Sequence, residues 1–460
     1  MVRRKQQFDY DLIVIGSGAA GSTAALAAAK DDHRVALMEA STFGGESPNW
    51  GDVPSKALLH AATLYDEARR ASRFGIRSNM LSHNFPSLMQ WKDRAIARTG
   101  AADNRAYYNQ VGIDTHHGHA HFLSPHEVSV NRTHVTASHF LIASGSIFET
   151  PNIYGIETIH YRTPQTIFDV KRLPRTLFII GSSAEAIEYA QLFSILGTKV
   201  YLAERSARLL PDEDIEVGEL FERYLHDVHG VNCLTQAQVV GFEKRGYGAQ
   251  VAYRRGQTSR SVHTEEILFV DNRAPATDLG LENASVYYTP AGIDVNDYLQ
   301  TSAKHIYAAG DVLGGACPTH LAMQQGRVAL YNMFHKSPQK ADATASLPRI
   351  TYTFPGIASV GLSENDCIKR DLAIHSALVP LSMVSRSNAS DFVDGFVKLI
   401  TDKKGALIGA TVVAPHAAEI IHELTLAIHH GMTAADIANT PHAFLSWSEA
   451  VRAAAVKLAH

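Results

Sequence analysis

The chain has 460 residues, more than a single hydrophobic core usually organises, so two to four domains are expected. Hydrophobic residues make up 45% and charged residues 19%, as in a soluble globular protein. Lys and Arg number 42 and Asp and Glu number 46, and this net charge of −4 excludes a strongly basic surface for nucleic acid or an anionic membrane.

The N-terminal residues, the apolar runs and the cysteines narrow the class of protein further. The first residues run into a strand without a cleavable apolar region, and no apolar run approaches the roughly 18 residues of a membrane span. We therefore expect a cytoplasmic enzyme with no nucleic-acid or membrane partner. Cys233, Cys317 and Cys367 are far apart and form no CxxC-type pair, which argues against a disulfide scaffold and a thiolate zinc site.

Residues 12–39 have the pattern of a dinucleotide-binding site. A buried strand is predicted at 12–15, and Gly16, Gly18 and Gly21 then open an alanine-rich helix whose N-terminal N–H groups suit a pyrophosphate. The next strand ends at Glu39, 23 positions after Gly16, where a carboxylate can accept hydrogen bonds from ribose hydroxyls.

Residues 43–59, "FGGESPNWGDVPSKALL", predict a glycine loop that leads into a helix. Asp52 stands at the expected helix start and Pro54 in its first turn. One interpretation makes Asp52 an N-cap, which contributes about 0.5–2 kcal/mol to helix stability. The other keeps its carboxylate as a polar or acid–base group for chemistry. Farther on, residues 140–151 predict a strand and a turn that leave the first domain.

Residues 177–204 repeat the dinucleotide pattern: a strand at 177–180, Gly181, a helix, and a strand that ends at Glu204, again 23 positions later. Ser183 and Ala186 replace the second and third glycines. Ser183 brings a side chain to a place where the backbone should approach phosphate, although its hydroxyl can donate a hydrogen bond there.

The residues after this second strand bear on the choice of nicotinamide nucleotide. Glu204 favours the free 2′-hydroxyl of NADH, whereas Arg205 and Arg208 can pair with the 2′-phosphate of NADPH. The balance favours NADH slightly.

Later, a strand into Gly310 and Asp311, followed by a helix, suits a second contact with a nucleotide's sugar-like chain. From residue 347 onwards, strands followed by helices indicate an α+β unit.

In order and spacing these motifs, with "VPSKALL", resemble the flavoprotein disulfide reductases. This pyridine nucleotide-disulfide oxidoreductase family includes mercuric reductase, dihydrolipoamide dehydrogenase and soluble transhydrogenase. The resemblance covers essentially the whole chain, and "GSSAEAIEYAQLF" is most similar to the mercuric reductase fingerprint. It implies an α/β fold with two Rossmann-like dinucleotide-binding domains, for FAD and NAD(P), and a C-terminal α+β dimerisation domain. The implied ranges are 1–155 and 281–345 for FAD, 156–280 for NAD(P), and 346–460 for the homodimer interface.

The resemblance also implies cofactor-binding residues. Lys56 and Glu188 match an ion pair beside the flavin N5, where the nicotinamide of NADH or NADPH stacks. The remaining expected residues are Gly16, Gly18, Ala19, Ala20, Gly21, Glu39, Ala40, Gly45, Glu46, Ser144, Gly145, Gly181, Ser183, Glu204, Arg205, Arg273, Gly310, Asp311 and Ala322.

Two departures from the family pattern stand out. The redox disulfide of the family lies in a G-G-x-C-x-x-x-x-C-x-P-S-K frame, and here the cysteine positions hold Ser47 and Asp52. The acid–base His of the family lies five residues before a Glu near the C-terminus. Here that Glu is Glu449 and Phe444 stands at the His position, where some relatives have Tyr.

A disulfide relay needs sulfur both to attack and to leave, so loss of both thiols removes it. Hydride transfer from NAD(P)H to FAD remains, with Lys56 stabilising the charge on reduced flavin and Glu188 holding Lys56. We therefore predict an FAD-dependent NAD(P)H oxidoreductase with a small-molecule acceptor other than a disulfide: quinone, oxygen, a second nicotinamide or a small electrophile. The candidate catalytic residues are Lys56, Glu188, Glu449, Phe444, Ser47 and Asp52.

The alternative is a non-catalytic flavin- and nucleotide-binding homologue that serves as a binding or assembly component. Ser183 and Phe444 favour it, whereas Lys56, Glu188 and Asp311 argue against it.

Weaker signals are isolated histidines and one thiol. His117, His119 and His121 alternate on one face of a possible strand, and an exposed histidine edge is favoured over a metal site. His442 lies two residues before Phe444 and is a substitute for the missing His only if its side chain reaches the same place. Cys317 follows Gly310 and Asp311 closely, and a small buried hydrophobic residue is favoured over a lone thiol near the flavin.

Overall fold

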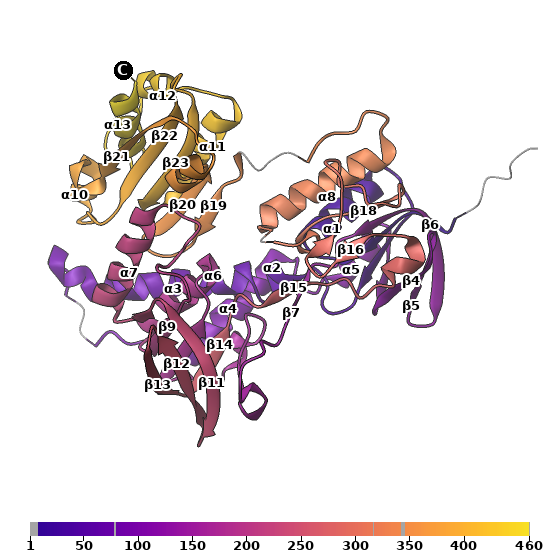
Figure 1. Cartoon of the computed structure of the whole chain (residues 1–460), viewed down its shortest axis with the longest axis horizontal. Coiled ribbons are helices and arrows are strands. Elements are labelled where there is room, and N and C mark those ends of the chain that lie inside the picture. Colours follow the sequence, from indigo (N-terminus) through magenta and orange to yellow (C-terminus); the bar gives the residue numbers. More distant parts are fainter. Residues whose placement is uncertain (1–7, 78–79, 316, 342–345, 460) are drawn as a thin grey trace, which may run out of the picture. The chain divides into compact units, whose positions relative to one another are not determined.

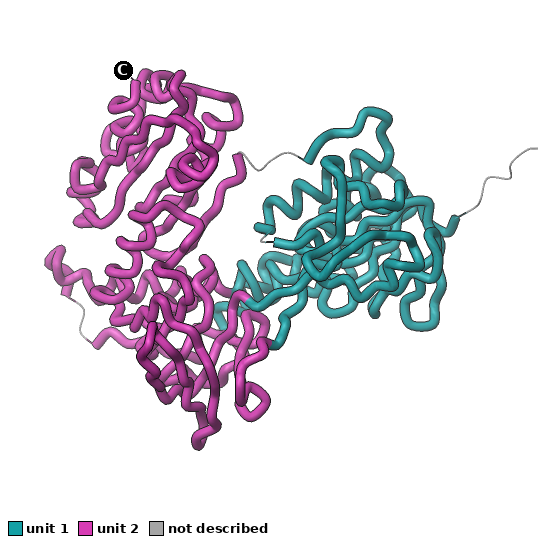
Figure 2. Tube along the Cα trace, in the orientation of Figure 1, with its two compact units in different colours: residues 1–54, 90–150, 272–342 teal, residues 55–89, 151–271, 343–460 magenta. Residues whose placement is uncertain are grey.

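The computed structural model describes residues 8–77, 80–315, 317–341 and 346–459 (Figure 1). Within these residues the chain forms two compact units, shown in Figure 2. Unit 1 contains residues 1–54, 90–150 and 272–342, and unit 2 contains residues 55–89, 151–271 and 343–460. The predicted domain ranges stay a prediction.

Unit 1 is built on a seven-stranded sheet with the order β3-β2-β1-β6-β5-β4, in which β18 also pairs with β6. Strands β1, β2, β3, β6 and β18 are linked by parallel pairings, whereas β4, β5 and β6 form an antiparallel meander. The strands are β1 (Tyr10–Ile15), β2 (Val35–Glu39), β3 (Ile113–His117), β4 (Ala120–Ser124), β5 (Glu127–Val130), β6 (Thr133–Ile142) and β18 (Ile306–Ala308).

Smaller elements complete unit 1. They are helices α1 (Ala19–Lys30), α2 (Glu46–Asn49), α5 (Arg105–Gln110) and α8 (Thr319–Phe334), the 3₁₀ turns η4 (Leu281–Ala284) and η5 (Asp311–Leu313), and the strand pairs β7 (Ser146–Phe148) with β15 (Arg273–Pro275) and β16 (Tyr288–Thr289) with β17 (Gly292–Ile293).

Strand β1 is covered on both faces. Leu12 and Val14 pack into a core with the alanines of α1 and with α8, and Ile13 and Ile15 pack into a second core with β4 and β5. This explains why residues 12–15 of β1 are continuously apolar rather than alternating. The carboxyl ends of β1, β2, β6 and β18 meet at one sheet edge, which is where open α/β sheets bind nucleotides.

Unit 2 contains a four-stranded parallel sheet with the order β10-β9-β8-β14 and a three-stranded antiparallel sheet, β11-β12-β13. Their elements are β8 (Thr176–Ile180), α6 (Ala184–Ile195), β9 (Lys199–Ala203), α7 (Ile215–His229), β10 (Asn232–Leu234), β11 (Ala237–Arg245), β12 (Gly248–Arg255), β13 (Thr258–Thr264) and β14 (Glu266–Phe269), with 3₁₀ turns η1 (Ala71–Phe74), η2 (Ile156–Thr158) and η3 (Ile167–Asp169). Helix α6 is buried almost all round, which explains why its apolar residues are not confined to one face.

The C-terminal part of unit 2 is an antiparallel sheet, β19-β20-β23-β22-β21, with α11 against β20 and β23 and α13 against β21 and β22 (Figure 1). Its elements are β19 (Arg349–Thr351), β20 (Gly356–Gly361), α9 (Glu364–Lys369), β21 (Ile374–Pro380), η7 (Leu381–Met383), α10 (Ser385–Ala389), β22 (Phe396–Asp402), β23 (Leu407–Ala414), α11 (Ala417–His429), α12 (Ala434–Asn439) and α13 (Glu449–Leu458). Helices α3 (Asp52–Arg70) and α4 (Phe85–Thr99) each contribute residues to both units.

Candidate functional site

The first glycine loop joins β1 to α1 at the carboxyl edge of the unit 1 sheet. Gly16 has φ +99°, and a Cβ there would lie 2.1 Å from the carbonyl oxygen of Ala143, so only glycine fits. Gly18 is the N-cap of α1 and makes no side-chain cap, while space is open at its Cα. The helix N-terminus therefore offers N–H groups to a phosphate, as predicted from the spacing.

Glu39 ends β2 beside this loop. Its Oε2 accepts the Ser17 N–H at 2.9 Å and the Ser17 hydroxyl at 2.6 Å, and its Oε1 accepts the Ser41 N–H at 2.8 Å. The carboxylate thus fixes the loop as well as standing where a ribose would bind. Ala40 follows it directly on the way to the second glycine loop.

Gly45 lies against the first loop. Its φ is +69°, and a Cβ on Gly45 would come within 2.5 Å of the Gly18 Cα. Across the same edge, Gly310 faces Ala20 and Ala322, whose Cβ atoms would lie 3.7 and 3.9 Å from a Cβ on Gly310. These expected cofactor residues, together with Ala19 and Gly21 of α1, do come together around one helix N-terminus. Close backbone approach of this kind fits a dinucleotide.

Asp311 begins η5 and accepts the Ser146 hydroxyl at 2.8 Å. Burial raises the pKa of the Asp311 carboxyl above its usual value, and the nearby Glu46 charge adds to the rise. The Ser146 hydrogen bond and Arg273 act in the opposite direction. Arg273 contacts both carboxylate oxygens of Glu46, with Nη2 2.6 Å from Oε1.

The turn after β6 completes this edge. Ser144 donates its hydroxyl to the Ala276 carbonyl at 2.7 Å, and the Gly145 carbonyl accepts the Ala276 N–H at 2.9 Å. Cys317 lies nearby in sequence, and burial raises the pKa of its thiol to about 12, so it is protonated and a poor nucleophile at neutral pH. The side chain is partly buried against the core of unit 1, and its Sγ lies 3.7 Å from Gln325 Oε1.

Ser47 and Asp52, at the two cysteine positions of the family frame, are in direct contact. The Ser47 hydroxyl donates to Asp52 Oδ2 at 2.7 Å, and the Thr319 hydroxyl of α8 donates to the same oxygen at 2.8 Å. Asp52 is the first residue of α3, so the predicted helix start is confirmed. Its carboxylate therefore joins α2, α3 and α8. Thr319 was missed from the sequence because it lies 267 positions from Asp52.

Lys56 and Glu188 form the predicted ion pair within unit 2. Lys56 Nζ lies 2.8 Å from Glu188 Oε2, and the side chains are 27% and 2% exposed. Glu188 Oε1 accepts the Tyr352 N–H at 2.7 Å, and Lys56 Nζ lies 5.0 Å from the centre of the Tyr352 ring. Both carboxylate oxygens are thus engaged, which fixes Glu188 and, through it, the position of the partly exposed Lys56 charge.

The second glycine loop joins β8 to α6. The Ser183 hydroxyl accepts the Ala186 N–H and so caps α6. The predicted role of this hydroxyl is to donate a hydrogen bond to a phosphate, and its proton remains able to donate. Asp271, just after β14, accepts the N–H groups of Ser182 at 2.9 Å and Ser183 at 3.4 Å. Asp271 was not predicted.

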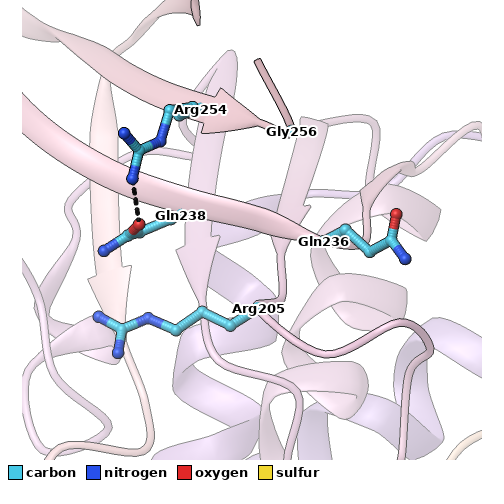
Figure 3. A pocket seen from close by; sticks show the side chains of 5 residues that line it. All are labelled: Arg205, Gln236, Gln238, Arg254 and Gly256. Atoms are coloured by element: carbon cyan, nitrogen blue, oxygen red, sulfur yellow. Dashed lines mark hydrogen bonds between the residues drawn. The ribbon is translucent and has the colours of Figure 1, made fainter. Parts of the chain in front are cut away.

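A hollow of about 370 Å³ lies beside the end of β9 (Figure 3). Arg205 and Arg254 both line it, and Arg254 donates to Gln238 Oε1 at 3.1 Å. Glu204, which precedes Arg205 in the sequence, accepts the Ser206 N–H. Arg208, the other predicted phosphate ligand, instead donates to backbone carbonyls of the segment that follows it, so it does not join Arg205 at this hollow.

The C-terminal candidates line a second hollow of about 640 Å³. Phe444 is 75% exposed, and Glu449 Oε2 accepts the Leu445 N–H at 3.1 Å. His442 lines the same hollow as Phe444 and Glu449. Its Nε2 lies 3.3 Å from Glu423 and its Nδ1 lies 2.9 Å from the Thr440 carbonyl.

The predicted single face of His117, His119 and His121 is wrong. His117 ends β3, His119 lies in the turn and His121 belongs to β4, because Gly118 breaks the strand with φ +148°. In the described part of the chain no group of three or more His, Cys, Asp or Glu side chains is arranged to hold a metal ion. Among the same residues, no helix combines the length and the apolarity needed to cross a bilayer.

Comparison with known proteins agrees with this geometry. The model of the pyridine nucleotide-disulphide oxidoreductase family matches residues 10–326, and the model of its dimerisation domain matches residues 347–455. The chain is 34% identical to mercuric reductase of Streptomyces lividans over 455 residues, covering 97% of this chain and 95% of that protein. It is 31% identical to dihydrolipoyl dehydrogenase of Geobacillus stearothermophilus over 460 residues, 98% of this chain and 96% of that protein.

A solved structure is similar over almost the whole chain. It is the HOCl-induced flavoprotein disulfide reductase RclA from Escherichia coli, with a TM-score of 0.86, 25% identity, and coverage of 97% of this chain and 99% of that one. The predicted fold class and the expected cofactors, FAD and NAD(P)H, are confirmed. The chain belongs to the pyridine nucleotide-disulphide oxidoreductase family, whose members are FAD-dependent NAD(P)H oxidoreductases.

Proposed function

We propose that this chain passes electrons from NAD(P)H through FAD directly to an acceptor other than a disulfide. The observation that carries the proposal is the contact between Ser47 and Asp52, 2.7 Å apart at the positions where the family frame has its two cysteines. Neither side chain can form or break a disulfide. The acceptor is proposed to be a quinone, oxygen, a second nicotinamide or a small electrophile.

Each unit has a distinct role in the proposal. The N-terminus of α1, Glu39 and Asp311 would hold FAD, since they combine open N–H groups with acids placed for sugar-like hydroxyls. When bound, FAD supplies the hydride-accepting and electron-donating chemistry. The domain ranges proposed are 1–155 and 281–345 for FAD, 156–280 for NAD(P)H, and 346–460 for the interface.

Lys56 and Glu188 are proposed as the groups that favour reduction. The family resemblance assigns this pair to the flavin N5. Glu188, which accepts the Tyr352 N–H, keeps the Lys56 cation in place. A preorganised positive charge stabilises negative charge as it develops. Asp52 and Ser47 would supply a polar, proton-bearing pair in place of the thiols. Phe444 and Glu449 are proposed to line the acceptor region.

The test is an anaerobic addition of NADH and NADPH to the purified yellow protein, followed by a panel of acceptors. We expect the flavin absorbance to bleach and then to recover with a quinone or oxygen, but not with lipoamide or oxidised glutathione. If neither nucleotide bleaches the flavin, the enzyme proposal is wrong and the non-catalytic alternative is favoured.

The choice between NADH and NADPH turns on the end of β9. Glu204 is held by the Ser206 N–H, and Arg205 lines the hollow with Arg254, which supports binding of a 2′-phosphate. We expect Arg205→Ala to weaken NADP⁺ binding about tenfold and to leave NAD⁺ binding unchanged, since only NADP⁺ carries that phosphate. Calorimetric titration with both nucleotides measures this, with exposed Arg260→Ala as the matched control. Equally weakened binding of NADP⁺ and NAD⁺ would contradict this prediction.

We also propose a homodimer, based on the dimerisation domain at residues 347–455. Light scattering is expected to give about twice the chain mass of 50.1 kDa, and a mass equal to one chain would contradict this. A cytoplasmic location stays a prediction.

A further inference from the structure

The second glycine loop, between β8 and α6, binds a carboxylate of its own chain, that of Asp271. Asp271 Oδ2 accepts the Ser182 N–H at 2.9 Å and the Ser183 N–H at 3.4 Å. The same oxygen would lie 2.4 Å from a Cβ at Gly181, so the glycine is needed for the carboxylate to approach. Asp271 reaches the loop because β14 runs parallel to β8, which brings the carboxyl ends of both strands to one edge.

The first glycine loop is arranged differently. There Glu39, from the strand on the other side, accepts the N–H and hydroxyl of Ser17, between the two glycines, and its other oxygen accepts the Ser41 N–H. Gly18 leaves the start of α1 without a side-chain cap. In the second loop the N–H of Ser183, at the position of the second glycine, is also taken by a carboxylate, and the Ser183 hydroxyl caps α6. Each loop therefore binds one carboxylate, but Asp271 accepts two loop N–H groups whereas Glu39 accepts one.

Loop N–H groups and a helix N-terminus attract phosphate because they are unpaired and positive. A carboxylate that already accepts those N–H groups reduces both effects and repels the pyrophosphate. We propose that Asp271 is an affinity-limiting residue of the NAD(P)H site, so that each nucleotide must bind against its charge. This inference rests on the proposed function in taking the second loop as the nicotinamide nucleotide site.

A purely structural role for Asp271 predicts the opposite change in nucleotide affinity when its charge is removed. If the carboxylate served mainly to shape the loop, as Glu39 does for the first loop, removing its charge would loosen the loop and weaken nucleotide binding. Asp271→Asn separates the two, because the amide oxygen can still accept the Ser182 N–H while the negative charge is gone.

The experiment compares wild-type protein, Asp271→Asn and the control Asp227→Asn, which removes a charge on α7 where the carboxylate contacts His226. Calorimetric titration of the FAD-loaded, oxidised proteins with NAD⁺ and NADP⁺ gives Kd without any need for flavin reduction. Anaerobic stopped-flow mixing with NADH and NADPH then gives the limiting rate constant of flavin reduction. Both are measured at low and high salt.

We expect Asp271→Asn to lower Kd for both nucleotides by roughly tenfold at low salt, because a like charge has been removed from the phosphate loop. The gain is expected to shrink at high salt, since screening already weakens the repulsion in wild type. The limiting rate constant is expected to stay at the wild-type value, because the reacting ring is untouched.

An unchanged or higher Kd in Asp271→Asn overturns the inference, as does equal improvement in Asp227→Asn. If wild type and variant bind nucleotide with the expected difference but neither reduces the flavin, the inference stands and the proposed function fails. If both reduce the flavin with the same Kd, the proposed function stands and the inference fails.

Discussion

Replacing Lys56 with Met is expected to slow the reduction of bound flavin by NAD(P)H by about 10²–10³-fold, the usual effect of removing one preorganised charge-stabilising group. Met keeps an unbranched side chain of similar length and removes its charge. The folded state should tolerate the change, since Lys56 is partly exposed, but it leaves buried Glu188 without its cation. Anaerobic stopped-flow mixing measures the rate directly.

Two variants control this prediction. Lys199→Met removes a lysine that also lies over a tyrosine ring, 5.4 Å from the centre of Tyr201, and should leave the rate unchanged. Glu188→Gln keeps an oxygen for the Tyr352 N–H but removes the charge that holds Lys56, so a smaller decrease, about tenfold, is expected. A wild-type rate in Lys56→Met would show that the ion pair is only structural.

Returning cysteines to both positions, Ser47→Cys with Asp52→Cys, is expected to restore a redox-active disulfide. The wild-type side chains already touch at 2.7 Å, so the two sulfurs would start close together. The double variant should then accept two more electrons per FAD than wild type and gain two titratable thiols on reduction. Alkylation of the reduced protein should abolish the activity that depends on the new disulfide.

The two single variants, Ser47→Cys and Asp52→Cys, are the matched controls, because each has one new thiol and no partner at the other position. Both should accept the same number of electrons as wild type. Removal of Asp52 also removes the acceptor of the Thr319 hydroxyl, and the Asp52→Cys control reports that effect separately. If the double variant gains no electrons, the two positions are not those of the family's cysteine pair.

The glycine loop of unit 1 was predictable because residues close together in the sequence determine it. The spacing from Gly16 to Glu39 follows from one strand–helix–strand unit, and the structure places Glu39 on Ser17 as that unit requires. The Lys56–Glu188 pair spans 132 positions, and only the family resemblance connected its members.

Other contacts were not predictable because they depend on which strands lie side by side. Asp271 reaches Ser182 only through the pairing of β14 with β8, and Arg254 reaches the hollow beside Arg205 only through the β11–β12 hairpin. The histidine alternation failed for a related reason, since period two has meaning only within one strand and Gly118 begins a turn.

The central claim is that electrons leave the flavin without passing through a thiol pair, and counting electrons tests it most directly. The purified wild-type protein is titrated anaerobically with NADH or NADPH while flavin absorbance and free thiols are followed. We predict complete flavin reduction at one equivalent of nucleotide per FAD, with no new thiol. Consumption of two equivalents, with the appearance of two thiols per chain, would contradict it.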